Sequence, residues 1–369
     1  MNGWLKWGLA ALVIVAVLVG AAAFIVLKVP AVQDALFDRM ARAALLRDRE
    51  AIMKDDALRV FVCGSSSPMP DPHRAKACIG VIAGGKIYIV DTGPQSYGNL
   101  AVWGIPVQHI AAIFYTHFHS DHIGDLGEFN MNSWGLGRTA PLDVYGPPGV
   151  ERVVAGFSEA YALDESYRIA HHGSELMSPD LWKMVPHPIP LQGEATPARD
   201  RTAVVLDDGS LKVTAIEVNH TPVEPAYGYR FDYKGRSIVI SGDTAFHEPL
   251  AKAAKDADVL FHEAQAQAMV QKLHDIASEA GNVRLTHILH DIQSYHSSPV
   301  DAAKIANEAN VKLVVFTHFT PPIQNMLAEA MFTRGVSDVR PDGWLMARDG
   351  TLIELPIGSK EIKMGTVAR

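Results

Sequence analysis

The sequence predicts an α/β domain that follows a membrane-spanning helix. Residues 8–27 form an uninterrupted apolar stretch flanked by Lys6 and Lys28, which is long enough to cross a bilayer as a helix. From residue 58 onward, short runs of β-branched and aromatic residues alternate with longer amphipathic segments. That alternation is typical of strands and helices in one α/β domain. Several of these strand-like runs end in a histidine or an aspartate.

The N-terminal stretch has two interpretations, an uncleaved anchor and a cleaved signal peptide with a cleavage site near residues 21–23. Because it is longer than a usual signal core, we favour the anchor. Lys6 competes with basic residues on the other side, and we expect the main domain outside the cytoplasm, in the periplasm. The predicted organisation is an anchor or signal segment at 1–30, an amphipathic linker helix at 31–57 and one domain at 58–369.

Composition bounds the partners of the chain. With 369 residues and 48% hydrophobic content, the chain can bury a large core. The net charge is −8, and Lys or Arg cluster only after the apolar stretch. Proteins that neutralise many phosphates usually present a basic face, so we do not expect a nucleic-acid partner. The sequence leaves the oligomeric state unknown, and a homodimer is compatible with it.

The first predicted strands surround a polar loop at 64–72 and a tight turn at Gly84-Gly85. Asp91 follows one of them and either supports a metal-bound histidine or caps a turn. Cys63 and Cys78 flank the polar loop and form either a disulfide or two buried thiols. The strands expected here are 58–63, 77–83, 86–90 and 113–116.

The rest of the chain continues the alternation, with a loosely patterned insertion at about 163–200 that contains His171 and His172. A turn at Asp349-Gly350 predicts a closing hairpin. The further expected strands are 142–145, 203–206, 211–218, 227–233, 236–240, 259–261, 313–316, 344–347 and 351–355. The expected helices are 148–162, 248–254, 264–280 and 299–309.

The densest cluster of chemistry-bearing residues lies directly after the strand at 113–116. His117 and His119 share a face in extended chain, and Asp121 and His122 fall in the first turn of a helix that begins near Ser120. Four nitrogen and oxygen ligands within six residues favour two adjacent metals. Imidazole and carboxylate without thiolate suit Zn²⁺, with Fe²⁺ or Mn²⁺ possible.

The same arrangement recurs along the chain. A histidine or an aspartate stands where a buried strand ends, and strand ends collected along one edge of a sheet build a rigid site from distant parts of a sequence. These positions are Asp91, His117, His220, Asp243, His262 and His318.

These residues resemble the metallo-β-lactamase superfamily. The resemblance covers about residues 58–355 and rests on Thr-His-Phe-His-Ser-Asp-His-Ile-Gly at 116–124, His220, Gly-Asp-Thr at 242–244 and Thr-His-Phe at 317–319. It implies an αββα sandwich with two zinc ions between the sheets. By this resemblance one zinc is bound by His117, His119 and His220, the other by Asp121, His122 and His318, and Asp243 bridges both.

Two further elements resemble the branch that contains ribonuclease Z and the zinc-dependent arylsulfatases. They are His262-Glu263-Ala264 and His296-Ser297-Ser298-Pro299. The resemblance implies that Glu263 and His296 act as a pair near the leaving group, where the imidazole donates a proton, and that Asp121 completes the catalytic set. The alternative is that His296 only caps a helix and Glu263 lies on the surface.

The predicted function is hydrolysis of small anionic esters, arylsulfatase-like or phosphodiesterase-like, by a metal-bridging hydroxide. Residues 220–230 look closer to the arylsulfatases, and a basic or glycine-rich arm for tRNA is not evident. Three alternatives remain open: a ribonuclease Z-like endonuclease that processes tRNA 3′ ends, a lactonase or β-lactamase-type hydrolase, and a non-enzymatic metal-binding scaffold.

Overall fold

The computed structural model describes residues 3–191 and 199–367. It divides into two compact units, Met1–Ala51 and Ile52–Arg369. The first unit contains α1 (Gly3–Lys28) and α2 (Pro30–Leu45). Within the described chain, one helical span, Trp7–Lys28, with a mean hydropathy of 3.0, is long and apolar enough to cross a membrane. The apolar helix predicted at the N-terminus is therefore present.

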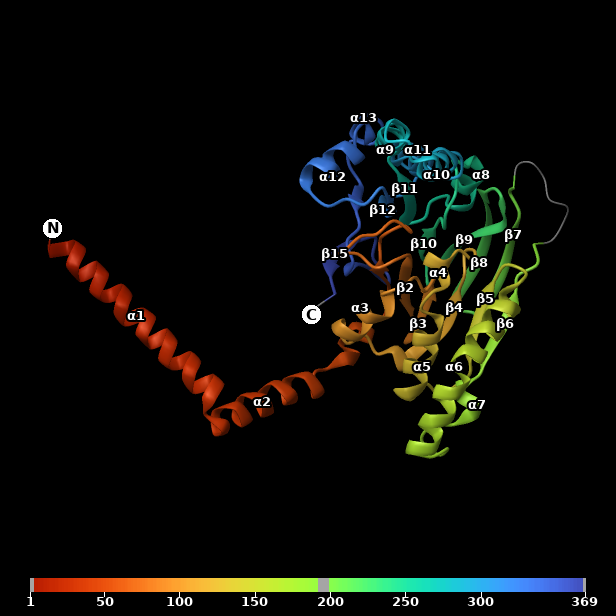
Figure 1. Ribbon diagram of the computed structural model, residues 1–369. Coiled ribbons are helices and arrows are strands. Elements are labelled where there is room, and N and C mark those ends of the chain that lie inside the picture. The colour runs from red at the N-terminus through yellow and green to blue at the C-terminus, as the bar shows by residue number, and fades with distance from the viewer. Residues whose placement is uncertain (1–2, 192–198, 368–369) are drawn as a thin grey trace. The chain divides into compact units, whose positions relative to one another are not determined.

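The second unit contains two mixed β-sheets (Figure 1). The first has the order β15-β14-β1-β2-β3-β4-β5-β6 and the second the order β13-β12-β11-β10-β9-β8-β7. The strands of the first sheet are β1 (Ala57–Gly64), β2 (Cys78–Ala83), β3 (Lys86–Val90), β4 (Ile110–Phe114), β5 (Leu142–Gly146), β6 (Met184–Pro188), β14 (Thr351–Pro356) and β15 (Lys363–Thr366). Those of the second are β7 (Thr202–Asp207), β8 (Leu211–His220), β9 (Val223–Tyr233), β10 (Arg236–Ile240), β11 (Val259–Gln265), β12 (Leu313–Thr320) and β13 (Trp344–Met346).

Helices cover the outer faces of both sheets (Figure 1). Helices α3 and α6 pack on the first sheet, and α8 and α11 pack on the second. The helices of this unit are α3 (Ser96–Trp103), α4 (Ser120–Ile123), α5 (Leu126–Gly135), α6 (Val150–His172), α7 (Pro179–Trp182), α8 (Glu248–Ala253), α9 (Gln267–Glu279), α10 (Val283–Asp291), α11 (Pro299–Glu308), α12 (Met326–Phe332) and α13 (Val336–Val339). Short 3₁₀ turns occupy Arg49–Met53, Val107–His109 and Ile292–Ser294. The layers are those of the predicted αββα sandwich.

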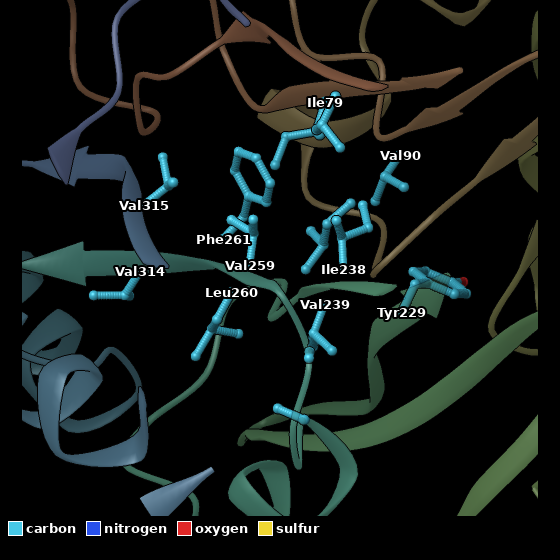
Figure 2. Packing of buried hydrophobic residues seen from close by; sticks show 14 of the residues in the cluster. Ile79, Val90, Tyr229, Ile238, Val239, Val259, Leu260, Phe261, Val314 and Val315 are labelled. Carbon is cyan, nitrogen blue, oxygen red and sulfur yellow. The ribbon is translucent and has the colours of Figure 1, made fainter. Parts of the chain in front are cut away.

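The main hydrophobic core fills the space between the sheets. Ile79 and Val90 of the first sheet face Ile238 and Phe261 of the second (Figure 2), and all four side chains are buried. Burial of apolar area at about 25 cal/mol per Å² is the dominant favourable contribution to such a fold. This core fixes the two sheets against each other, so the strand ends along their shared edge are held rigidly.

The predicted tight turn at Gly84-Gly85 is confirmed, and a second hairpin is present. β2 pairs with β3 over Gly84-Gly85, and β9 pairs with β10 over Lys234-Gly235, each pair antiparallel. The region 163–200 differs from the expected loose insertion, because α6 continues to His172 and β6 joins the edge of the first sheet beside β5. Only Val150 and Val154 of α6 are buried, so its sequence shows no continuous apolar stripe. Its final residues His171 and His172 are exposed, and residues 192–198 lie outside the described chain.

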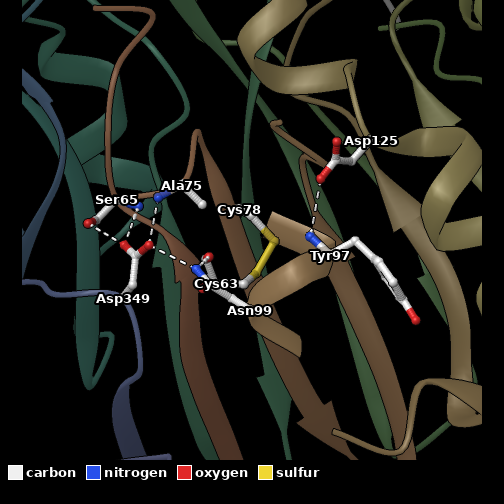
Figure 3. The surroundings of a disulfide bond; sticks show 8 residues. All are labelled: Cys63, Ser65, Ala75, Cys78, Tyr97, Asn99, Asp125 and Asp349. Atoms are coloured by element: carbon white, nitrogen blue, oxygen red, sulfur yellow. Dashed lines mark hydrogen bonds between the residues drawn. A yellow bond between two sulfur atoms is a disulfide. The ribbon is translucent and has the colours of Figure 1, made fainter. Parts of the chain in front are cut away.

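The predicted closing hairpin is wrong. β13 pairs with β12 in the second sheet, whereas β14 pairs with β1 in the first, so the turn at 349–350 crosses between the sheets. The half-buried Asp349 carboxylate fixes this crossing (Figure 3). It accepts hydrogen bonds from the backbone N–H groups of Ser65 and Ala75, at 3.1 and 2.7 Å, and from Nδ2 of Asn99 at 2.9 Å. A turn motif does not reveal such distant partners.

A disulfide joins Cys63 at the end of β1 to Cys78 at the start of β2 (Figure 3). It closes the base of the loop at residues 64–77, and the Asp349 carboxylate binds Ser65 and Ala75 within the same loop. Of the two possibilities that the sequence leaves open, the structure has the disulfide, and the described residues contain no free cysteine.

Replacing both cysteines with serine is expected to lower the free energy of unfolding by about 3 kcal/mol. The sequence separation is 15, and closing a loop of that size restricts the unfolded chain by about this amount. Urea unfolding of the two proteins, with and without a thiol reductant, measures the difference. The reductant should shift the wild-type midpoint toward that of the variant and leave the variant unchanged. Identical midpoints for wild type and variant would contradict the prediction.

Candidate metal centre

The seven predicted metal ligands lie at strand ends on the shared edge of the two sheets, and the structure brings them together. The first sheet supplies four of them just after β4, two in the following loop and two in α4, and the second sheet supplies three from β8, β12 and the loop after β10. Groups of three have all their candidate ligand atoms within 4.8 Å of one another. The seven residues are His117, His119, Asp121, His122, His220, Asp243 and His318.

The residues form two sets. We call His117, His119 and His220 the first ligand set; its ring nitrogens form one such group, and Nε2 of His117 lies 2.9 Å from Nδ1 of His119. We call Asp121, His122 and His318 the second ligand set. In it, Oδ2 of Asp121 lies 3.5 Å from Nε2 of His122 and 3.3 Å from Nε2 of His318. The grouping that the resemblance implies is therefore compatible with the geometry.

Asp243 lies between the two sets. Its Oδ2 is 3.4 Å from Nε2 of His122 and 3.4 Å from Nε2 of His318 in the second set, and 3.9 and 4.0 Å from Nε2 of His117 and His220 in the first. The preceding Gly242 permits this position. It has a φ of 61°, and a Cβ there would come within 2.4 Å of the Tyr227 carbonyl oxygen, so a larger residue would displace the turn.

These donors fit divalent metal ions. Two ligands bound tetrahedrally at about 2.0–2.1 Å lie about 3.3 Å apart, which matches the 3.3–3.5 Å spacings within the second set and to Asp243. Nε2 of His122 and Nε2 of His220 are buried and have no hydrogen-bond partner among the described residues. Buried polar atoms are normally paired, so two ring nitrogens left unpaired beside carboxylates indicate a cation.

The protonation states of His117, His220 and Asp121 suit ligation. Despite the burial of His122, the carboxylates around it raise its pKa well above the usual range, so that imidazole releases a proton when it binds a metal. Burial holds the pKa of His117 well below its usual range and lowers that of His220 to about 4. Burial raises the pKa of Asp121, but the imidazoles of His122 and His318 outweigh it and bring the value to about 2. Neutral imidazole and ionised carboxylate are the forms that bind metals.

Further contacts orient the ligating rings. Asp91 Oδ2 lies 2.8 Å from Nδ1 of His122, and Asp91 also accepts the backbone N–H of Thr116 at 2.9 Å. Of the two roles considered for Asp91, the geometry matches support of His122. The Nδ1 atom of His220 lies 3.0 Å from the carbonyl oxygen of Tyr295, to which it donates. Such contacts hold the other ring nitrogen toward a metal.

Glu263 and His296 form a buried pair beside these ligands. Nδ1 of His296 lies 2.9 Å from Oε1 of Glu263, and the backbone N–H groups of Ser297 and Thr244 donate to the same oxygen. Burial opposes protonation of His296, but the Glu263 carboxylate outweighs it, so the pKa of His296 is raised. Ser298, not His296, caps α11, and Glu263 is not on the surface.

Two other residues complete the description. His262 lies inside β11, where its ring donates to the carbonyl oxygen of Glu263, and none of the candidate metal groups among the described residues includes it. Tyr295 was not among the predicted site residues. It lines a cavity beside His119 and His220, and its position directly before His296 was the signal available in the sequence.

Comparison with known proteins identifies the family. Residues 87–319 match the model of the Beta-lactamase superfamily domain. Over 270 residues the chain is 36% identical to ribonuclease Z of Mycobacterium bovis, a match that covers 72% of this chain and 87% of the relative. Ribonuclease Z of Mycolicibacterium paratuberculosis is 34% identical over the same shares. The crystal structure of the short form of human tRNase Z has a TM-score of 0.58 and 22% identity, and covers 81% of this chain and all of that chain.

Two predictions are corrected by these relatives. The arylsulfatase-like hydrolase of small esters is wrong as the leading interpretation, and so is the exclusion of a nucleic-acid partner, because the relatives are named ribonuclease Z. The net charge of −8 averages over the whole surface. It does not describe the field at a centre where bound cations would be the largest local charges.

The described geometry fits a divalent-metal centre. The ribonuclease Z relatives and the αββα layers agree with it. The chain therefore belongs to the metallo-β-lactamase superfamily, on its ribonuclease Z side, and is a metal-dependent hydrolase of ester bonds.

Proposed function

We propose that the chain is a ribonuclease Z-type endoribonuclease that hydrolyses RNA phosphodiester bonds, with the 3′ end of precursor tRNA as its first test substrate. The observation that carries the proposal is the combination of two adjoining ligand sets with the buried Glu263–His296 pair. Relatives at 34–36% identity that bear the name ribonuclease Z support the choice of RNA over other esters.

We propose Zn²⁺ as the metal of both sets, with the first set holding one ion, the second set the other, and Asp243 shared. Imidazole and carboxylate ligands at tetrahedral spacing favour zinc, and Mn²⁺ or Fe²⁺ suits the same donors. Two bound metal ions would lower the pKa of a water and stabilise both oxygens of a displacement at phosphorus.

The chain's own residues would orient the metal ligands and donate the proton to the leaving group. Asp91 and the Tyr295 carbonyl hold His122 and His220 in their orientations through hydrogen bonds of 2.8 and 3.0 Å. Glu263 binds Nδ1 of His296, which leaves Nε2 as the nitrogen that donates a proton to the departing oxygen. Although burial opposes it, the Glu263 carboxylate raises the pKa of His296, which favours the protonated imidazole for this step. General-acid catalysis of this kind contributes about 10² to 10⁴ in rate.

The test uses the full chain purified in detergent and loaded with Zn²⁺. It is incubated with a precursor tRNA, with bis(p-nitrophenyl) phosphate and with p-nitrophenyl sulfate. We expect cleavage of the RNA at its 3′ side and turnover of the phosphodiester, both stopped by a chelator and restored by zinc. An intact precursor tRNA in the presence of phosphodiester turnover would overturn the RNA substrate.

We also propose that residues 1–30 anchor the chain in a membrane and that residues 31–57 link the anchor to a hydrolase domain at 58–369. The buried Cys63–Cys78 disulfide supports a position outside the cytoplasm, because disulfides persist in oxidising compartments. A reporter enzyme fused after Arg369 tests the side. Activity outside the cytoplasm supports the proposal and limits the natural substrate to RNA that reaches that compartment, whereas a cytoplasmic signal contradicts it.

A further inference from the structure

A cavity of about 410 Å³ opens directly beside the first ligand set. Two of its lining residues, His119 and His220, belong to that set. The others lie at the turn into β9 and at the end of α10 and the segment after it, and they are Pro222, Val223, Asp291, Ser294 and Tyr295. This volume suits a small organic group rather than a folded macromolecule. Because the cavity adjoins the first ligand set, a part of the substrate that fills it would lie next to the group that reacts at the metals.

One wall of the cavity is aromatic and apolar. Tyr295 is half-buried, with its ring centroid 5.0 Å from that of His220 and 4.9 Å from that of His296. Its backbone is held by the hydrogen bond from His220. Pro222 and Val223 add apolar surface. A fixed aromatic ring beside apolar side chains is a platform on which a nucleobase stacks.

The polar edge of the cavity carries a carboxylate. Asp291 is exposed, and its Oδ2 lies 2.9 Å from Nδ1 of His287. The Ser294 hydroxyl donates to the Asp291 carbonyl oxygen at 2.8 Å. A negative group at this position opposes a phosphate and favours a partner with N–H donors. A carboxylate accepts hydrogen bonds only, so it suits the exocyclic amino group of cytosine, adenine or guanine. Uracil has no amino group, and its one ring N–H lies between two carbonyl oxygens that a carboxylate repels.

We propose that this cavity is the subsite for the nucleobase next to the scissile phosphodiester. Tyr295 stacks on the base, and Asp291 selects a base that carries an amino group. The assignment rests on the proposed ribonuclease function and adds the base specificity of that same site.

The experiment measures base preference and kinetics together. The zinc-loaded full chain is given a single-stranded RNA with a random segment, and the ends of the products are sequenced. We expect cytosine, adenine or guanine in excess over uracil at one of the two positions that flank the cut. Tyr295→Ala should raise KM for a short RNA about tenfold and change kcat less, because stacking is lost equally in the ground and transition states. Tyr295→Phe should keep most of the wild-type affinity, because it retains the aromatic ring.

Asp291→Asn should weaken the discrimination against uracil, because an amide both donates and accepts. Asp275→Asn, an exposed carboxylate on α9 outside the cavity, is the matched control and should leave preference and KM unchanged. Metal content and thermal unfolding of each variant show whether it is folded. RNA cleavage by the wild type without base preference, or an unchanged KM in folded Tyr295→Ala, overturns the subsite alone. Absence of RNA cleavage by the wild type overturns the proposed function and the subsite together.

Discussion

Asp243→Ala is expected to give a folded protein that has lost most of its bound metal and at least about a thousandfold in hydrolytic rate, because both ions of a dinuclear site act in the displacement. The Asp243 carboxylate lies within 3.4–4.0 Å of histidines from both ligand sets. Its removal leaves each set one ligand short and places the two cations side by side without a shared anion. Elemental analysis of the purified variant, set against the two ions per chain expected in the wild type, measures the loss.

Asp275→Ala is the matched control, since it also removes a carboxylate but from the exposed face of α9. It should retain both metals and full activity. Two zinc ions per chain in Asp243→Ala would contradict the bridging position, whatever the activity of the variant.

His296→Ala is expected to leave the metal content unchanged and to lower kcat by about 10² to 10⁴, the usual contribution of a positioned proton donor. The loss should depend on the substrate. Leaving groups that depart easily as anions need little protonation, so aryl phosphodiesters with acidic phenols should be affected least and alkyl esters most. A series of phosphodiesters with leaving groups of graded acidity measures this dependence.

Glu263→Gln provides the second variant for the same pair. The amide keeps a hydrogen bond to His296 Nδ1 but removes the charge that raises the imidazole pKa. We expect a smaller loss of kcat than in His296→Ala. Activity should also fall as the pH rises, and this fall should begin at a lower pH than in the wild type, because the imidazole loses its proton earlier. An equal loss across all leaving groups in His296→Ala would show that the histidine does not act on the departing oxygen.

The sequence predicts the strand-end placement of the site well, because a short apolar run followed by His117 or His220 carries both signals at once. It predicts less well those features of the fold that depend on contacts between residues far apart in the sequence. The crossing at Asp349 depends on Ser65, Ala75 and Asn99, which lie about 250 or more residues earlier in the chain. No local pattern encodes such partners, so a turn motif was interpreted as a hairpin.

The extent of α6 and the role of Tyr295 were missed for a related reason. Helix α6 continues to His172 with most of its surface in solvent, and the apolar periodicity on which helix prediction depends is weak there. The position of Tyr295 beside His220 depends on the packing of the segment after α10 against β8. The ribonuclease Z interpretation was only an alternative because net charge describes the whole surface, whereas recognition depends on the field at one edge.

The candidate metal ligands come from both sheets, with four after β4 and three from β8, β12 and the loop after β10. Either sheet alone would therefore bind neither metal ion tightly. Metal binding therefore requires that the two sheets are folded against each other. It stabilises the folded chain relative to the unfolded chain, by about 4 kcal/mol when free metal is a thousandfold above its dissociation constant. A lack of divalent metal would then do more than stop hydrolysis: it would leave newly made chains easier to unfold and easier for proteases to remove.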